Sequence, residues 1–142
     1  MTVISIPTPS TEKLSLVAKR FGIRLIVLFG SAARGKMHEE SDIDVGVLTD
    51  RPITFDQRLK LWHALSSLFR TDIDLAMLNH ADPVFGFEVA RDGRLLFERD
   101  KDAWENWRSY KIRQYWDTKK FRDDLRRYIA RCAERMSDAA AE

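Results

Sequence analysis

The chain has 142 residues, of which 44% are hydrophobic and 32% charged, and its formal net charge is +2. This length predicts one domain without a second, substrate-holding one, and no apolar run approaches the roughly 18 residues of a membrane helix. The N-terminal segment lacks the pattern of a secretory signal, and the single Cys132 cannot form an internal disulfide. We therefore expect a cytoplasmic protein without membrane association.

Helices and strands alternate along the first 100 residues. Ser10 and Thr11 precede a helix that is predicted to end at Gly22. A buried strand is expected over residues 23–29, followed by a polar, glycine-punctuated loop, with room for one helical turn, over residues 30–41. Apolar spacing then predicts a strand at 43–47, a helix at 55–69, a strand at 73–78, a short helix at 82–91 and an edge strand at 94–98. This order favours an α/β or α+β fold, built as two layers with helices on one sheet face.

The C-terminal segment differs from the rest of the chain. Apolar side chains recur every three to four residues and predict one long helix from about Ala103 to Met136. Residues 1–100 hold 13 Lys+Arg and 14 Asp+Glu (net −1), whereas residues 101–135 hold 11 and 6 (net +5). A solvated helix face explains such charge, and so does contact with RNA. The interleaved aromatic residues favour a protein partner, so we divide the chain into a core at 1–100 and a C-terminal helix at 101–142 that packs on the core, a partner or both.

Three aspartates stand at predicted strand positions. Asp42 and Asp44 are two residues apart, so their carboxylates project from the same face of a strand. Asp74 follows Ile73 on the next strand and can reach the same point. Mg²⁺ prefers such oxygen ligands, and burial of three unpaired carboxylates without a function costs several kcal/mol. Asp72, two positions before Asp74, is the alternative third carboxylate.

A glycine-serine turn follows the first predicted strand. Gly30 and Gly35 allow close approach of the backbone to a ligand. Ser31 adds a hydroxyl and backbone N–H groups, which suit a phosphate, and Arg34 adds a guanidinium for phosphate oxygens. The order of these features along the chain indicates a site for a metal-bound nucleotide.

The stretch LFGSAARGKMHEESDIDVGVL, with Gly30-Ser31 and Asp42-x-Asp44, resembles the nucleotidyltransferase superfamily with the polymerase-β-like fold. More narrowly, the chain resembles the minimal nucleotidyltransferase (MNT) antitoxins of HEPN–MNT toxin–antitoxin pairs. The segment TDIDLAMLN at residues 71–79 is similar to their third-strand motif. The resemblance implies a small mixed sheet covered by helices, with a long C-terminal helix.

The resemblance also implies roles and partners. Asp42, Asp44 and Asp74 would be catalytic and hold two Mg²⁺ ions, and the residues that bind ATP would be Gly30, Ser31, Arg34 and Ser41. The reaction would transfer AMP to a hydroxyl, expected on a tyrosine, of a HEPN ribonuclease toxin in a hetero-oligomer. Two alternatives stay open: transfer to a small, aminoglycoside-type acceptor with a partner subunit, and an antitoxin that acts by binding alone.

Overall fold

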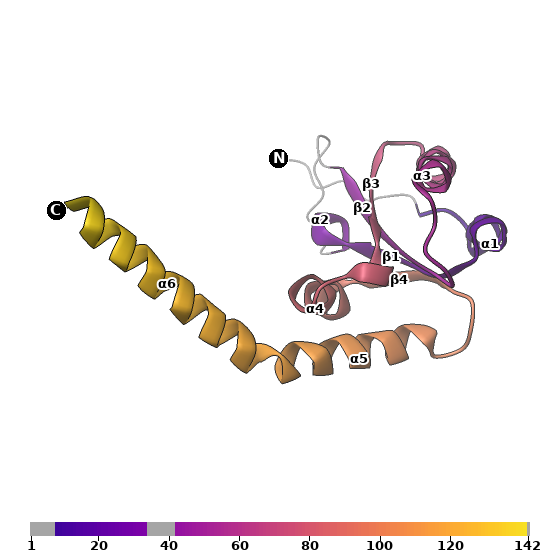
Figure 1. The fold of residues 1–142 in the computed structure, drawn as a ribbon. Helices are drawn as coiled ribbons and strands as arrows, with labels where there is room; N and C mark the ends of the chain where they lie inside the picture. The colour runs from indigo at the N-terminus through magenta and orange to yellow at the C-terminus, as the bar shows by residue number, and fades with distance from the viewer. Residues whose placement is uncertain (1–7, 34–41, 142) are drawn as a thin grey trace.

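A mixed sheet of four strands forms the centre of the molecule (Figure 1). The computed structural model describes residues 8–33 and 42–141. The strands, which lie in the order β3-β2-β1-β4, are β1 (Ile23–Phe29), β2 (Ile43–Thr49), β3 (Ile73–Met77) and β4 (Arg94–Glu98). Strand β1 is antiparallel to β2 and to β4, whereas β2 and β3 are parallel. The mixed sheet and the edge position of β4 confirm the predicted fold class.

Helices cover both faces of this sheet, and the two-layer prediction is therefore wrong. Helices α1 (Thr11–Phe21) and α3 (Phe55–Phe69) lie on one face, and α4 (Pro83–Asp92) and α5 (Ala103–Asp117) lie on the other (Figure 1). The alternation of β1 explains this, because Ile26 and Leu28 pack with α1 and α3, whereas Leu25 and Val27 pack with α4 and α5. A strand that is apolar on both sides needs a cover on both sides.

Caps confirm the predicted ends of α1 and also mark the start of α3. The side chain of Ser10 accepts a hydrogen bond from the backbone N–H of Lys13, and Gly22 ends α1 in the left-handed conformation. Thr54 and Gln57 form a reciprocal capping box at the start of α3. These local signals lie within a few residues of one another, which explains why the sequence predicts them well.

The C-terminal segment forms two helices rather than the single helix expected. Helix α5 ends at Asp117 and α6 (Lys119–Ala141) leaves the body of the molecule at an angle (Figure 1). At the break, the hydroxyl of Thr118 donates to the carbonyl of Gln114 over 2.7 Å. Arg122 donates to the carbonyl of Tyr115 over 2.7 Å, and its guanidinium lies 4.1 Å from the centre of the Tyr115 ring. No helix in the described part of the chain is both long and apolar enough to cross a membrane.

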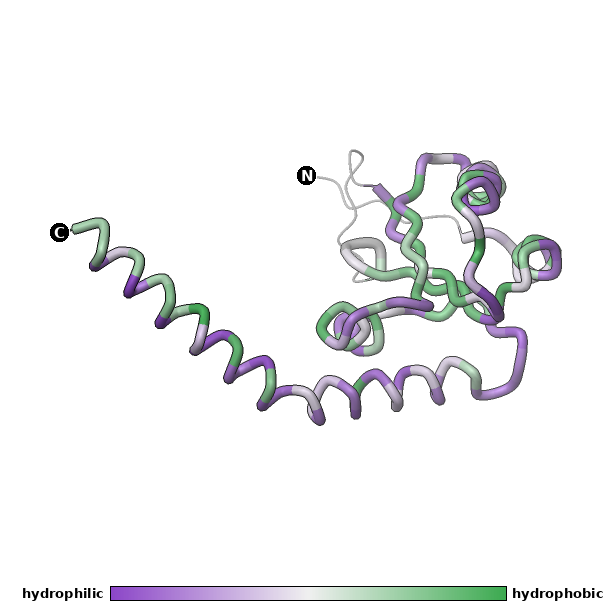
Figure 2. The backbone as a smooth tube through the Cα atoms, viewed as in Figure 1, coloured by the Kyte–Doolittle hydropathy of each residue, from purple (hydrophilic) through white to green (hydrophobic). Residues whose placement is uncertain are grey.

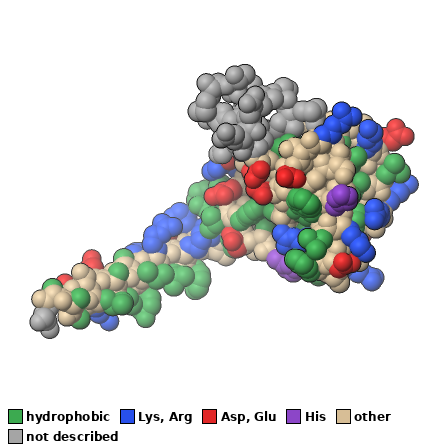
Figure 3. Space-filling view, turned by 90° about the horizontal axis from the view of Figure 1, so that it is seen from above, with side chains coloured by type: hydrophobic (Ala, Val, Ile, Leu, Met, Phe, Trp, Pro, Cys, Tyr) green, Lys and Arg blue, Asp and Glu red, His purple; other side chains and the backbone are tan. Residues whose placement is uncertain are grey.

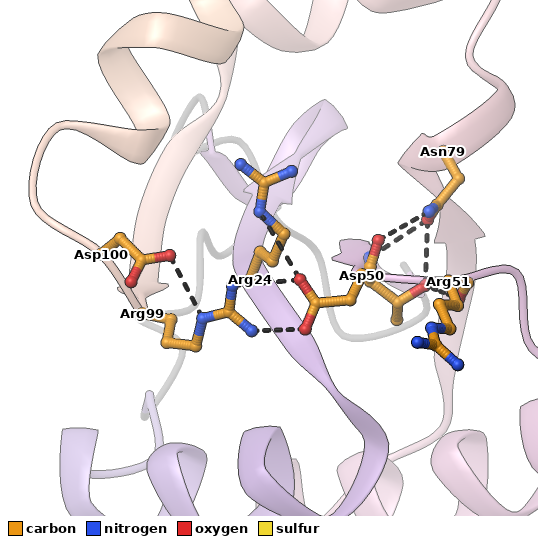
Figure 4. A network of polar contacts seen from close by, with 7 residues as sticks. Arg24, Asp50, Arg51, Asn79, Arg99 and Asp100 are labelled. Atoms are coloured by element: carbon orange, nitrogen blue, oxygen red, sulfur yellow. Dashed lines mark hydrogen bonds and ion pairs between the residues drawn. The ribbon is translucent and has the colours of Figure 1, made fainter.

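A polar network ties the strands together at the end of β2 (Figure 4). Asp50 accepts two hydrogen bonds from Arg99, at 2.5 and 3.0 Å, and Arg24 lies 4.0 Å from the same carboxylate. The Asn79 side chain accepts from the N–H of Thr49 over 3.1 Å and donates to its carbonyl over 2.8 Å. These contacts join the ends of β1, β2 and β4 to the segment after β3.

Candidate functional site

Asp44 and Asp74 face each other across the parallel pair β2–β3. Their Cα atoms are register partners, so the two side chains project from the same face of the sheet. Asp42 lies just before β2, two residues from Asp44. Asp44 is half-buried, while Asp42 and Asp74 are exposed. The backbone thus brings two of the three predicted carboxylates together and places the third beside them.

This cluster changes the acidity of Asp44. Burial raises its pKa above the ordinary value, and the negative charges of Asp74 and Asp42 raise it further. A side-chain hydrogen bond with Asp74 also favours the protonated form of Asp44. Like charges at this spacing repel each other, and a cation bound between them relieves that repulsion.

Gly30 lies directly against the carboxylate of Asp44. It begins the short helix α2 (Gly30–Ala33), immediately after β1, whose last residue Phe29 is the register partner of Asp44. Gly30 has φ +67°, and a Cβ added there would lie 2.3 Å from Oδ2 of Asp44. A side chain is therefore excluded by both the backbone conformation and the space. This geometry gives Gly30 a specific reason to be glycine.

The remaining predicted nucleotide-binding residues are described in part or not at all. The backbone of Ser31 belongs to α2, in the helical turn that the sequence allowed. Arg34 and Ser41 lie outside the described residues. The structure thus describes the backbones of Gly30 and Ser31 from the predicted phosphate site.

The geometry separates Asp74 from Asp72. Asp72 precedes β3, and it is not among the charges that raise the pKa of Asp44, whereas Asp74 is. Within residues 8–33 and 42–141, no three His, Cys, Asp or Glu side chains converge closely enough to hold a metal ion. The carboxylate oxygens of the Asp44–Asp74 pair nevertheless suit a hard cation such as Mg²⁺. Asp42, two residues before Asp44, offers a third carboxylate.

Two side chains of α3 hold the strand that carries Asp74, and the sequence did not reveal them. The indole N–H of Trp62 donates to the carbonyl of Ile73 over 2.7 Å, and Arg58 donates to the carbonyl of Leu75 over 2.9 Å. Both carbonyls belong to β3, an edge strand of the sheet. Such contacts join elements that are far apart in sequence. Helical periodicity identifies Trp62 as an apolar residue of the helix, but it cannot predict the bond to β3.

A pocket of about 280 Å³ adjoins Gly30 on the α4 side of the sheet. Its walls include Phe29 from β1 and Phe85, Val89 and Arg91 from α4. The rings of Phe29 and Phe85 meet edge to face, with centroids 5.4 Å apart. The pocket offers an apolar wall next to Gly30, which itself lies against Asp44. The sequence predicted the α4 helix without predicting this contact.

Comparison with known families and proteins places these features in context. The model of the family described as polymerase beta, nucleotidyltransferase matches residues 12–102.

Two curated relatives are both named protein adenylyltransferase MntA. The one from Shewanella oneidensis is 35% identical over 80 residues, which are 56% of this chain and 58% of the relative. The one from Aphanizomenon flos-aquae is 29% identical over 109 residues, 66% of this chain and 69% of the relative. The chain therefore spans little more than half the length of the first relative.

Solved structures share the fold over most of the chain. A crystal structure described as a toxin-antitoxin with AMP-PNP has a TM-score of 0.71 at 26% identity, and covers 84% of this chain and 98% of its own. A mutant of the toxin-antitoxin MntA-HpeT has a TM-score of 0.68, also at 26% identity, over 84% and 96% of the two chains. The fold of these structures extends beyond the residues that the family model matches.

Proposed function

The chain belongs to the polymerase beta nucleotidyltransferase family, and from that premise we propose that it transfers AMP from ATP to a protein hydroxyl. The acceptor is a tyrosine of a HEPN ribonuclease toxin, and the chain acts as the antitoxin of that toxin in the cytoplasm. The observation that carries the proposal is the register pair Asp44–Asp74 beside Gly30. Nucleotide transfer needs carboxylates next to a backbone that can approach phosphates.

The comparisons support the acceptor class. Both curated relatives carry the name protein adenylyltransferase, and a toxin-antitoxin structure with AMP-PNP shares the fold. The motif resemblance of Gly30-Ser31 and Asp42-x-Asp44 to MNT antitoxins points to a HEPN toxin as the partner. A hetero-oligomer of the two proteins follows from this assignment.

In the proposed reaction, the acceptor hydroxyl attacks the α-phosphate of ATP. A new phosphoester bond forms, the bond between the α- and β-phosphates breaks, and diphosphate leaves. Asp74 accepts the hydroxyl proton, since its side chain is exposed at the edge strand while Asp44 is half-buried. The backbone of Gly30 and the side chains of Ser31, Arg34 and Ser41 bind the phosphates.

Asp42, Asp44 and Asp74 are the residues that would hold two Mg²⁺ ions. Their carboxylates are the hard oxygen ligands that Mg²⁺ prefers, and the hydrogen atom of Gly30 leaves Oδ2 of Asp44 uncrowded where a Cβ would block it. When bound, the two ions supply positive charge that stabilises the entering and leaving oxygens. The residues of the chain orient the phosphates and take up the proton.

Transfer of labelled AMP tests the proposal. The purified chain is incubated with α-labelled ATP, Mg²⁺ and the HEPN protein encoded beside its gene, and label on that protein is measured. We expect transfer by the natural chain and by Asp72→Asn, and loss of at least about a hundredfold in Asp44→Asn and Asp74→Asn, within the range typical of acid-base groups. The Asp72 variant is the matched control, since it removes a nearby carboxylate that does not lie against Asp44.

Other outcomes identify other functions. Diphosphate release with small hydroxylated acceptors, but without label on the HEPN protein, would indicate the aminoglycoside-type reaction instead. Protection of cells from the toxin by the Asp44→Asn variant would indicate an antitoxin that acts by binding alone. Each result contradicts the proposal through a separate measurement.

A further inference from the structure

Helix α6 carries an apolar stripe that the rest of the chain does not cover. We define the α6 stripe as the six residues Phe121, Leu125, Tyr128, Ile129, Cys132 and Met136. At 100° per residue they fall on one face, about 100° wide. None of the residues of α6 is buried, and Phe121 and Met136 are 71% and 74% exposed. Figures 2 and 3 show α6 extending from the body with apolar residues gathered along one side.

The aromatic residues of α5 are used differently. Trp104 is buried and stacks on Trp107, with centroids 5.7 Å apart. Tyr115 stacks on Phe87 of α4 at 4.1 Å. These contacts cover part of α5. Tyr110 and Trp116 of α5 stay exposed, but most of the large exposed apolar side chains of the C-terminal segment lie on α6. An exposed apolar surface of this kind marks an interaction site.

Arginines line both edges of the α6 stripe. On the same helical projection, Arg122 and Arg126 lie along one edge, and Arg131 and Arg135 lie along the other. Within α6, Asp124 shares an edge with them and is paired with Arg127 over 3.0 Å. Asp123 lies on the opposite side of the helix and is paired with Lys119 over 2.6 Å. Asp138 also lies beside Arg131. The stripe is therefore an apolar band with one positive edge and one edge that carries arginines beside aspartates.

We propose that the α6 stripe docks a helical surface of another protein whose apolar band is flanked by Asp and Glu. This inference rests on the proposed function in one respect, which is that the partner is the HEPN toxin. Charge argues against a second copy of this chain as the occupant. Two α6 helices packed antiparallel place each edge against the same edge of the other copy. In either direction the net charge of +3 over residues 119–141, from seven Lys and Arg and four Asp and Glu, repels a second copy. An acid-flanked partner pairs with Arg126, Arg131 and Arg135 and buries the stripe. Arg122 is already bonded to Tyr115 within the chain.

Two pairs of substitutions test the apolar contact. Leu125→Glu with Ile129→Glu places two carboxylates in the stripe, and Ala130→Glu with Ser137→Glu places two on exposed positions outside it. Binding of each full-length variant to the purified HEPN protein is measured by calorimetry. We expect at least about thirtyfold weaker binding in the stripe variant, the size of one hot-spot loss, and unchanged binding in the control. Circular dichroism should show the same thermal midpoint for both, since none of the four positions is buried.

A second comparison tests the charged edges. Arg131→Glu with Arg135→Glu should weaken binding and reduce its dependence on salt. Lys120→Glu with Arg127→Glu makes the same change of charge at positions that lie farther around the helix from the stripe, and it should have a smaller effect. Equal loss in the two variants would show that net charge, and not the edges of the stripe, governs binding, and would overturn the proposed orientation.

The failure of docking and the failure of the proposed function are distinguishable. If the stripe variant binds and modifies the HEPN protein as the natural chain does, docking by α6 is overturned and the adenylyltransferase stands. If the natural chain binds the HEPN protein without transferring AMP, the reaction is overturned and docking stands. A dimer of the chain alone in analytical ultracentrifugation, dissolved by the stripe substitutions, would show that a second copy is the occupant.

Discussion

The Cα of Gly30 lies so close to Asp44 that a Cβ on it would come within 2.3 Å of the carboxylate oxygen Oδ2. The contact joins the end of β1 to the strand that carries the carboxylate pair. The backbone of the glycine is therefore part of the wall around the carboxylate.

Gly30→Ala should lower AMP transfer severely, because the new methyl group displaces Asp44. Gly22→Ala is the matched control: Gly22 has nearly the same φ, +66°, but its added Cβ would meet only Asp50 Oδ2, at 4.0 Å. Both variants should lose about 1–2 kcal/mol of unfolding free energy from the left-handed conformation. Urea unfolding measures that loss of stability. Transfer from labelled ATP should then be low in Gly30→Ala and normal in Gly22→Ala. Equal activity in both variants would contradict the role of the close contact.

Asp44→Asn should raise thermal stability in Mg²⁺-free buffer at neutral pH while abolishing transfer. The pKa of Asp44 is raised in the folded state by burial and by Asp74 and Asp42, so its ionised form disfavours folding. The natural chain therefore gains stability as the pH falls through the raised pKa. The difference in thermal midpoint between the natural chain and Asp44→Asn becomes smaller. Thermal midpoints recorded from pH 7 down to pH 4 test this. A gap that widens at low pH would contradict it.

Asp50→Asn should lower thermal stability at neutral pH and lose that effect in acid. Hydrogen bonds from Arg99 lower the pKa of Asp50 below its ordinary value of 3.8. A lowered carboxylate pKa stabilises the fold above the ordinary value and ceases to do so as the pH falls through the folded value. Thermal midpoints near pH 7 and pH 3 measure the difference. Asp56→Asn, which removes an exposed partner of Lys60, is the control and should change little.

Trp62→Phe should lower the unfolding free energy by about 1 kcal/mol, the usual contribution of one hydrogen bond. The change removes the 2.7 Å bond to the carbonyl of Ile73 and frees the edge strand that carries Asp74. Hydrogen exchange should therefore become faster in β3 than in β1. Phe55→Ala on the same helix is the control, since Phe55 is 76% exposed and its loss should cost less than about 0.5 kcal/mol.

Local patterns predicted the elements, because caps and alternation act within a few residues. The spacing of Asp42 and Asp44 likewise predicted a shared strand face, and register then brought Asp74 to it. The break at Thr118 could not be predicted in this way, because no Gly or Pro marks it and the bonds of Arg122 to the preceding turn accompany it.

The sequence also did not predict the burial of Lys111, because it shows only a basic residue in a basic helix. The residue is 7% exposed, and its ammonium group donates to the carbonyl of Ala81 over 3.0 Å. Space for it comes from Gly86, where a Cβ would lie 2.7 Å from Cδ of the lysine. Burial lowers the pKa of Lys111. A charge pattern describes composition, and it cannot show which charged side chain meets a glycine on another helix.

The break at Thr118 lets two properties of the chain evolve separately. Residues before it build the sheet, its covers and the carboxylate pair, whereas α6 contributes no buried side chain. Substitutions along α6 can therefore change the preferred partner at little cost to the folded core. Exchange of residues 119–141 between two such proteins should redirect each one to the other's partner while its chemistry stays the same.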